Sequence, residues 1–438
     1  MAEKSSRTAT LLVICTAHFL MPFMMSAVGV ALPAIGREFK ASAMQLGLVE
    51  TTYVLSASIF LLAMGRMGDI YGRRRVFQIG LIAFTCAGGL LSQAWSIESL
   101  IGLRFTITTI KPWGEKRTHL DYEIDGMVVK INVLVNTFGW RAIFYLVVPL
   151  GLITFAVSWF RLRGEWAESR GEPFDWQGSL IYAVAILMLI TGASNLDRGH
   201  WAWALALAGM AGIALFLRFE AKAAYPVLDV ALLRRNRVFA FSNLAALLNY
   251  AATFGVTFFL SLYLQFVKGM NPREAGTLLI IQPIIQALFS PFCGRLADRF
   301  PAPLVATIGM SFCALGLAIA ASISAASSLT RVVLTLITLG LGFALFSSPN
   351  ISVIMGSIPS RYLGVASGLN STMRTLGMMA SMTVITIIFS ILMGDQAVTP
   401  QTQPQFLVSM HTALLTFSGL CVIGIFLSLG RLRDVRSA

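Results

Sequence analysis

A carboxylate in the second apolar segment of the chain is the side chain best placed to carry out chemistry. Glu50 lies beside Thr51, Thr52 and Tyr53 in a run of otherwise uncharged residues. An apolar environment favours the neutral form of a carboxyl group, so Glu50 could take up and release a proton near neutral pH. It is therefore a candidate proton carrier. The alternative is a hydrated carboxylate, because Glu50 lies near one end of its segment.

Two further ionisable residues interrupt apolar segments. His18 could titrate in the physiological range, although a lone histidine can equally be a packing residue. Arg374 could contact Asp69 or an anionic group, or its long side chain could reach the edge of the apolar layer. Placing a charge in an apolar layer costs at least a few kcal/mol, so each of these residues is a functional hypothesis.

Uncharged polar residues recur in several apolar segments and are candidates for lining a substrate cavity. Their hydroxyl and amide groups could bind a substrate, or they could link one helix to the next. The five cysteines all lie inside apolar segments without the spacing of metal ligands, so neither a metal site nor a disulfide framework is expected. The cavity candidates are Tyr53, Asn243, Asn249, Gln282 and Gln286.

The elements that position these residues must be membrane-spanning helices. Of the 438 residues, 56% are hydrophobic and only 12% are charged, which excludes an ordinary soluble domain. Apolar runs of about twenty residues recur, each long enough to cross a hydrocarbon layer of about 30 Å as a helix. We predict an all-α bundle with about twelve spans, at roughly residues 9–33, 46–64, 76–95, 142–160, 178–194, 201–217, 238–264, 275–293, 303–323, 331–353, 363–393 and 406–430.

The positive charge lies in short loops between the apolar runs. A net charge of +13 could indicate a nucleic-acid partner, but lysines and arginines do not follow one helical face, so no nucleic acid is expected. Basic residues concentrate in alternate loops and in the segment from Arg431 onward, as in cytoplasmic loops of membrane proteins. This pattern predicts a multi-pass protein with both termini in the cytoplasm.

A short motif occurs twice and indicates two related halves. The first copy, Gly-Arg-Met-Gly-Asp, begins at Gly65, and the second, Gly-Arg-Leu-Ala-Asp, begins at Gly294. Both are expected in cytoplasmic loops between two spans. Parallel repeats of this kind are a known build of membrane transporters. The residues of the second copy are Gly294, Arg295, Asp298 and Arg299.

The segment from Gly65 to Arg75 resembles the signature loop of the major facilitator superfamily. Its glycines permit a tight turn and a close approach of helices, and its aspartate can face the positive end of a helix in the opposite half. The resemblance implies that Asp69 and Arg73 latch and release one conformation. A merely basic topogenic loop would explain the arginines but not the spacing of Gly and Asp. The signature residues are Gly65, Arg66, Asp69, Gly72, Arg73 and Arg74.

Further segments are similar to the fourteen-span drug:proton antiporter branch of that superfamily. They begin at Val30, Gly139, Phe174 and Gly364. The resemblance implies a proton gradient as the energy source and no cofactor. One departure weakens it: Met24 stands where the branch commonly has an acidic residue, and a thioether cannot carry a proton.

Residues 106–133 depart from this resemblance. Leu103-Arg104-Phe105 looks like the start of the family's fourth span, whose basic residue is tied to proton transfer, so Arg104 is a further coupling candidate. Two family spans are then missing. The charged segment in their place alternates like a short strand and resembles a piece of NAD-dependent DNA ligases, although the nucleophilic lysine motif of those enzymes is absent. We interpret it as a foreign insert.

These observations lead to one main hypothesis and two alternatives. We expect a monomeric transporter of the bacterial inner membrane that exports drugs or other amphipathic small molecules in exchange for protons, and that is not an enzyme. The alternatives are a defective, non-transporting membrane protein and, less favoured, a nucleotidyltransferase built on the insert. The expected parts are residues 1–105, the insert 106–133, residues 134–237 with two central spans, and a six-span half at 238–438.

Overall fold

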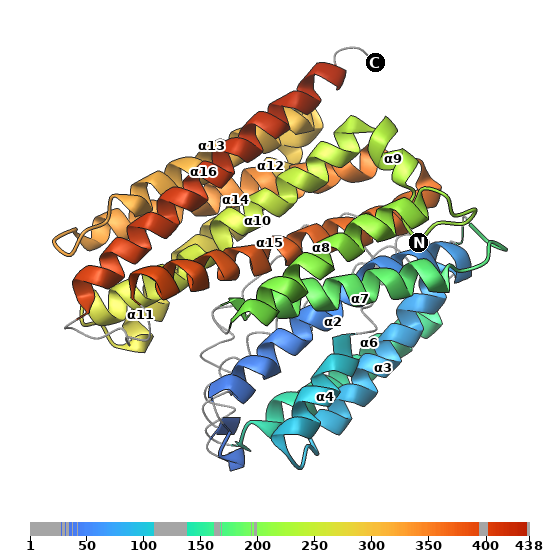
Figure 1. Cartoon of the computed structure of the whole chain (residues 1–438), viewed down its shortest axis with the longest axis horizontal. Helices are drawn as coiled ribbons and strands as arrows, with labels where there is room; N and C mark the ends of the chain where they lie inside the picture. Colours follow the sequence, from blue (N-terminus) through green and yellow to red (C-terminus); the bar gives the residue numbers. More distant parts are fainter. Residues whose placement is uncertain are drawn as a thin grey trace. The chain divides into compact units, whose positions relative to one another are not determined.

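Every regular element in the described part of this computed structural model is a helix (Figure 1). The structure describes residues 43–108, 138–161, 169–193, 199–393 and 402–435, together with a few single residues between 28 and 41 and at 167, 195 and 196. The first helices are α2 (Ala43–Tyr71), α3 (Arg73–Leu91), α4 (Ile97–Thr108), α6 (Arg141–Arg161), α7 (Trp176–Ala193) and α8 (His200–Glu220). The later ones are α9 (Val230–Arg235), α10 (Arg237–Leu262), η2 (Tyr263–Val267), α11 (Pro272–Leu279), α12 (Ile281–Arg299), α13 (Ala302–Ala321), α14 (Leu329–Gly356), η3 (Ser360–Tyr362), α15 (Leu363–Leu392) and α16 (Gln403–Val435).

Ten helical segments within the described residues are long and apolar enough to cross a membrane. They coincide with ten of the predicted spans, from 76–95 onward, and so confirm a polytopic helical protein. The predicted span at 46–64 falls within α2, whereas the span at 9–33 lies almost entirely outside the described residues. The predicted insert at 106–133 also lies outside them, apart from the end of α4.

The chain divides into two compact units. Unit 1 comprises Met1–Ile186, Lys222–Leu228 and Pro359–Leu369, and unit 2 comprises Leu187–Ala221, Asp229–Ile358 and Asn370–Ala438. Both units leave large apolar side chains at their surfaces: Phe160 is 73% exposed and Phe426 is 69% exposed. Such surfaces suit a lipid environment, where an apolar side chain gains nothing by turning inward.

The core of unit 1 forms where α3 packs against α4 and α6. Leu81 and Phe84 of α3 are buried with Phe144 and Val147 of α6 and Leu100 of α4. The helices α3 and α6 pack closely at Gly88. A Cβ added there would lie only 3.4 Å from a methyl group of Val147. Small residues of this kind let membrane helices approach and gain van der Waals contacts. This core also includes Val49 and Tyr53, and so joins the first half of α2 to α3, α4 and α6.

The core of unit 2 is built from α10, α13, α14 and α16, which run side by side in Figure 1. Between α13 and α14 the backbones are in close contact: a Cβ added to Gly309 would lie 2.5 Å from the nitrogen of Phe346, and one added to Gly342 would lie 2.7 Å from the nitrogen of Cys313. Such small-residue contacts are typical of stable helix pairs in membranes. Aromatic residues such as Phe259 and Phe417 fill the remaining space.

Candidate functional site

The signature segment forms the end of α2, one linking residue and the start of α3. Residues Gly65 to Tyr71 are helical, so the predicted loop is in fact the last two turns of α2. The helix ends because Gly72 adopts φ of 102°, a conformation that costs little only for glycine. Arg73 then begins α3. A single residue therefore reverses the chain, as the glycine in the motif predicts.

The side chain of Asp69, near the end of α2, faces the N-terminus of α15. Its two carboxylate oxygens accept hydrogen bonds from the backbone N–H groups of Gly364 and Val365, each at 3.1 Å. These N–H groups have no partner within their own helix, and they form the positive end of its dipole. The Asp69 side chain is fully buried. The prediction that this aspartate faces the positive end of a helix is confirmed.

Arg73 completes the environment of Asp69. Its Nε and Nη2 donate to one Asp69 oxygen at 3.1 and 2.7 Å, and Nη2 also donates to the carbonyl oxygen of Ser360 at 3.3 Å. Burial raises the pKa of the Asp69 carboxyl, whereas the Arg73 charge and hydrogen bonds, and those from Val365 and Gly364, act in the opposite direction. The ion pair of Asp69 with Arg73 therefore joins the end of α2 to the start of α3.

The first glycine of the motif allows α2 and α15 to touch. A Cβ added to Gly65 would lie 2.5 Å from the carbonyl oxygen of Gly364, and a Cβ added to Gly364 would lie 2.5 Å from the Gly65 oxygen and from an Asp69 carboxylate oxygen. Backbone atoms cannot move aside as flexible side chains do. Both positions therefore require glycine for the Asp69 contact to form.

A segment from Ser169 to Asp175, here called the strap, lies against the signature segment. The backbone N–H of Ser169 donates to the Asp69 carbonyl oxygen at 3.0 Å. Buried Arg66 donates to the Ser169 hydroxyl at 3.3 Å and forms an ion pair with Glu172. Phe174 packs on apolar residues of α2. Arg66 is thus a structural cation that fixes the strap.

The other signature arginine, Arg74, reaches α6. Its Nη2 donates to the carbonyl oxygen of Trp159 at 3.2 Å. The last turn of a helix leaves carbonyl oxygens without intrahelical partners, and an arginine is well suited to satisfy them. Arg74 therefore joins the start of α3 to the end of α6.

Arg104 lies fully buried between α4 and α2. Its Nε donates to the carbonyl oxygen of Val49 at 3.1 Å, and its guanidinium lies 4.8 Å from the centre of the Tyr53 ring. This brings Arg104 beside the backbone of the residue that precedes Glu50. The side chains of Glu50 and His18 lie outside the described residues.

The candidates in unit 2 come from three helices, α10, α12 and α15. Asn249 is fully buried, and its side-chain amide has no hydrogen-bond partner among the described residues. The side-chain nitrogen of Asn243 donates to the Phe239 carbonyl oxygen at 2.9 Å, so this donor is used within α10 itself. Gln282 and Gln286 are half-buried on α12. The Arg374 guanidinium lies 5.9 Å from the Tyr250 ring centre.

The second copy of the motif differs from the first in its environment. Gly294 is buried, but Arg295, Asp298 and Arg299 are exposed at the end of α12, which is again helical where a loop is predicted. No ion pair involves Asp298 in the described part of the chain. The sequence repeat is therefore not matched by a second buried aspartate.

Arg431 is a buried residue that the sequence reasoning missed. The charge pattern assigns Arg431 to a basic tail, but it lies inside α16 with no exposed surface. It donates to Ser242 Oγ at 2.8 Å, to Asn350 Oδ1 at 2.7 Å and to the Pro303 carbonyl oxygen at 3.3 Å, and so connects α16 with α10, α14 and α13. Polar residues within the apolar runs of α10 and α14 were the available signal.

The described residues contain no cluster of three or more His, Cys, Asp or Glu side chains suited to a metal ion. The described cysteines, Cys86, Cys293, Cys313 and Cys421, are free thiols.

Curated relatives of this chain are membrane transporters and export proteins. The riboflavin transporter RibZ of Clostridioides difficile is 25% identical, with 95% of this chain and 96% of that protein aligned. The multidrug efflux pump LfrA of Mycolicibacterium smegmatis is 26% identical over 88% of this chain and 82% of the pump. The tetracenomycin C resistance and export protein of Streptomyces glaucescens is also 26% identical, over 88% of this chain and 76% of that protein.

Solved transporters share the fold. The human organic anion transporter MFSD10 superposes with a TM-score of 0.61 at 13% identity, covering 97% of this chain and 98% of that one. The POT family transporter PepTSo superposes with a TM-score of 0.58 at 13% identity, covering 98% of each chain.

The family model of the Major Facilitator Superfamily matches residues 14–108 and 131–382, and it leaves a gap where the foreign insert is predicted. Its members and the relatives above are transporters, which agrees with the expectation that the chain is not an enzyme. The Asp69 site, the helical architecture and this match lead to one conclusion: the chain belongs to the Major Facilitator Superfamily.

Proposed function

We propose that this protein exports drugs or other amphipathic small molecules across a bacterial inner membrane in exchange for protons, by alternating access. We place it in the fourteen-span drug:proton antiporter branch, with two spans replaced by the segment around 106–133. Both termini are then cytoplasmic, and the proton gradient supplies the energy without a cofactor. Export is supported by two relatives, a resistance and export protein from Streptomyces and a multidrug efflux pump from Mycolicibacterium.

The observation that carries this proposal is the buried contact of Asp69 with the start of α15. Alternating access needs contacts that hold one state and can be broken to reach the other. Two charge-assisted hydrogen bonds from Gly364 and Val365, with Arg73 beside them, are strong enough to bias such an equilibrium by a few kcal/mol. The proposed role of Asp69 is therefore a conformational latch.

Proton coupling is assigned to the region where α2 meets α4. Arg104 is held by the Val49 carbonyl oxygen and the Tyr53 ring, next to Glu50 in sequence. A guanidinium near a carboxyl group favours release of its proton, and access to the outside would favour uptake. Glu50 is the proposed proton carrier and Arg104 its regulator, with Arg374 and His18 as further coupling candidates.

The substrate is proposed to bind among Tyr53, Asn243, Asn249, Gln282 and Gln286. Asn249 is the best supported of these, because a buried amide without partners is costly unless something binds to it. A second candidate function is transport of a flavin-like planar heterocycle. It is favoured by the riboflavin transporter, which aligns with this chain over nearly the whole length of both proteins.

Export is tested in a pump-deficient bacterial host. Cells that express the protein should accumulate less of a fluorescent amphipathic dye than cells with an empty vector, and an uncoupler should remove the difference. Riboflavin uptake and release in the same cells test the second candidate. If accumulation of neither compound changes at normal expression, the proposed export is wrong and the non-transporting alternative is favoured.

Coupling is tested with Glu50→Gln. The glutamine keeps the shape of the side chain but cannot carry a proton, so proton-driven efflux should fall at least tenfold while counterflow of substrate continues. Full proton-driven efflux in this variant at equal expression would exclude Glu50 as the carrier.

A further inference from the structure

The ends of α6 and α16 repeat one pattern, a serine followed three residues later by an arginine. The serine of each pair contacts the sixth residue of a neighbouring helix. Gln78 Nε2, in α3, donates to Ser158 Oγ at 3.3 Å. The hydroxyl oxygens of Thr307, in α13, and Ser428 lie 2.5 Å apart. The repeat between the two units therefore extends from the sequence to the contacts.

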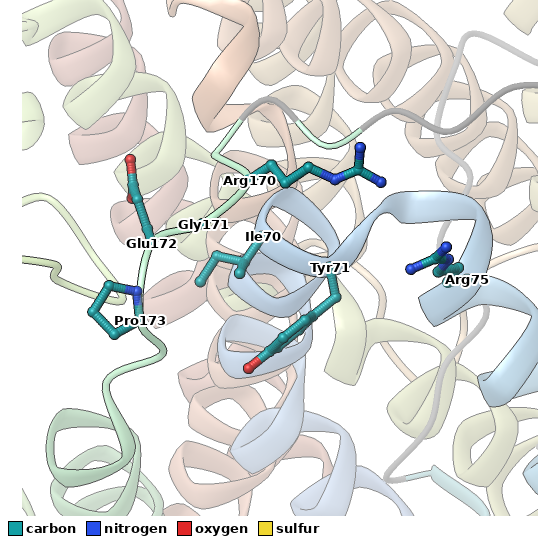
Figure 2. Close-up of a pocket in the computed structure, with 7 residues that line it drawn as sticks. All are labelled: Ile70, Tyr71, Arg75, Arg170, Gly171, Glu172 and Pro173. Atoms are coloured by element: carbon teal, nitrogen blue, oxygen red, sulfur yellow. The ribbon is translucent and has the colours of Figure 1, made fainter.

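The arginines of the two pairs differ in their surroundings. Arg161 is exposed on α6, as are Arg75 and Arg170, which line a cavity of about 280 Å³ beside the end of α2 (Figure 2). Exposed arginines such as these suit the basic loops that orient a membrane protein. Arg431 has no exposed surface, so orientation does not explain its burial.

The partners of Arg431 are all uncharged. Its hydrogen bonds are accepted by a hydroxyl, a side-chain amide and a backbone carbonyl oxygen, and its Nε has no partner. No carboxylate pairs with it in the part of the chain that the structure describes. A buried cation is normally paired with a carboxylate, and separating such an ion pair is more costly than breaking hydrogen bonds to neutral acceptors. Arg431 is therefore held by contacts that can be broken and remade.

Asn350 connects Arg431 to α10. Its Oδ1 accepts from Arg431 at 2.7 Å, and its Nδ2 donates to the Ser242 carbonyl oxygen at 3.1 Å. Asn350 directly follows Pro349, which lies inside α14. Proline has no N–H group to donate to the preceding turn, so the helix is weakened here. Residues 350–356 are therefore the last turns of α14 beyond a weak point, and Arg431 holds the first of them.

The far end of this segment is tied to α10 as well. Asn236, the N-cap of α10, donates from its Nδ2 to the Ser357 carbonyl oxygen. Gly364, whose N–H group binds Asp69, follows Ser357 by only seven positions. A displacement of residues 350–356 is therefore passed to the start of α15 through a short stretch of chain.

We propose that Arg431, Asn350 and Ser242 form a releasable catch for the end of α14. The catch holds residues 350–356 on α10 and α16 while Asp69 is engaged with α15, and it opens when that contact breaks. This inference rests on the proposed alternating access, because a protein that changes state needs contacts that hold one state and can be broken. Arg431 is thus a positioning residue and not part of the substrate site.

The first test measures the distance between two spin labels by pulsed electron paramagnetic resonance. The label sites are Gly356→Cys, where a Cβ meets nothing within 4 Å, and Arg237→Cys at an exposed position, in a chain whose five cysteines are replaced by alanine. This parent should give mainly one distance. Asp69→Asn should add a second, longer distance, and Arg431→Gln should raise the share of that distance about threefold or more over the parent. A single unchanged distance in Asp69→Asn would indicate a permanent clamp and overturn the proposal.

Two controls separate release of the catch from general loosening. A label pair at Leu315 of α13 and Leu334 in the first half of α14, both about half exposed, should keep its distance in every variant. Arg161→Gln, which changes the matching arginine of α6, should leave the distance between positions 237 and 356 as it is in the parent. Ser242→Ala, which removes one acceptor with little change in size, should act in the same direction as loss of the arginine. Equal broadening of both label pairs would overturn the proposal.

A cross-link tests whether release is needed for transport. Positions 237 and 356 adjoin the hydrogen-bonded residues Asn236 and Ser357, so a short cleavable thiol cross-linker can join cysteines placed there. The cross-link should lower dye efflux about tenfold or more, and reduction of the linker should restore it. Full efflux with the cross-link in place would overturn the catch and leave the proposed export intact. Absence of efflux in the parent would count against the proposed export, and the label distances, which need no substrate, would still decide on the catch.

Discussion

A carboxylate oxygen of Asp69 lies 3.1 Å from the backbone nitrogen of Gly364, two residues into the helix whose N-terminus it caps. Asp69 lies almost 300 residues earlier in the chain, so this contact joins sequence-distant segments within unit 1. The Asp69 carboxylate is a negative charge that faces the positive end of the α15 dipole. Because the site is buried, this interaction is stronger than it would be at a surface.

Replacing Asp69 by asparagine should weaken the latch without changing the size of the side chain. The variant loses its charge and one of its two acceptors, at a cost of about 1–3 kcal/mol to the latched state, or roughly tenfold or more in its population. Transport rates should fall by a similar factor. A single-cysteine labelling assay at the end of α15 should show faster modification in the variant than in the parent, and equal labelling rates would contradict the latch.

Gly65→Ala should destabilise the protein. The new methyl group would lie 2.5 Å from the Gly364 carbonyl oxygen, so the two helices must separate, at a cost of about 1–3 kcal/mol. The midpoint of thermal unfolding in detergent should fall by several degrees. Gly102→Ala is the matched control, because a Cβ at this position of α4 meets nothing within 4 Å. Its midpoint should stay the same or rise, as expected for alanine in a helix.

Arg431→Ala should have a larger effect on stability than its position near the end of the chain indicates. Removing the guanidinium leaves Ser242 Oγ, Asn350 Oδ1 and the Pro303 carbonyl oxygen without their donor, at about 1–3 kcal/mol for each buried group. We expect a strong decrease in the thermal midpoint and in the yield of monodisperse protein. Arg218→Ala removes an exposed arginine and should leave both unchanged. Similar losses in the two variants would show that the hydrogen bonds of Arg431 do not stabilise the helix packing.

The ion pair of Glu38 with Arg141 should make the stability of the protein depend on pH in the acid range. Burial alone would raise the pKa of Glu38, but hydrogen bonds from Trp140 and Arg141 and the attraction of Arg141 outweigh it, so the pKa lies below the ordinary 4.5. A lowered pKa in the folded state means that this stabilisation is present above pH 4.5 and is lost as the pH falls through the folded-state pKa. The midpoint difference between the parent and Glu38→Gln should therefore be largest near neutral pH and vanish in strong acid. A pH-independent difference would contradict the ionic origin.

The sequence predicted the helices and the contact of Asp69 with a helix end well, because both follow from local patterns. Apolar length determines a span, and α3, α6, α13 and α14 begin and end within a few residues of the predicted limits. The motif residues Gly72 and Asp69 have roles that depend on residue type, namely a positive φ and a charge at a helix end. Such roles can be inferred without coordinates.

Arg431 and the strap were not predictable in the same way. Arg431 follows the last apolar run directly, so counting charges assigns it to a solvated tail, whereas α16 continues to Val435. Its partners lie on three other helices, and the pairing depends on how those helices are rotated about their axes. Likewise, nothing in the segment near Ser169 indicates that it docks on Arg66. Long-range packing of this kind needs the folded structure.

The one-residue connection between α2 and α3 has a consequence for how the chain tolerates changes in length. α2 ends at Tyr71 and α3 starts at Arg73, so Gly72 alone makes the reversal, and no slack exists to absorb an extra residue. An added residue would rotate α3 relative to α2 and displace Arg73 from the carboxylate it contacts. Epitope tags and reporter insertions are therefore better placed elsewhere, for example at the exposed residues Ala221 and Lys222 that follow α8.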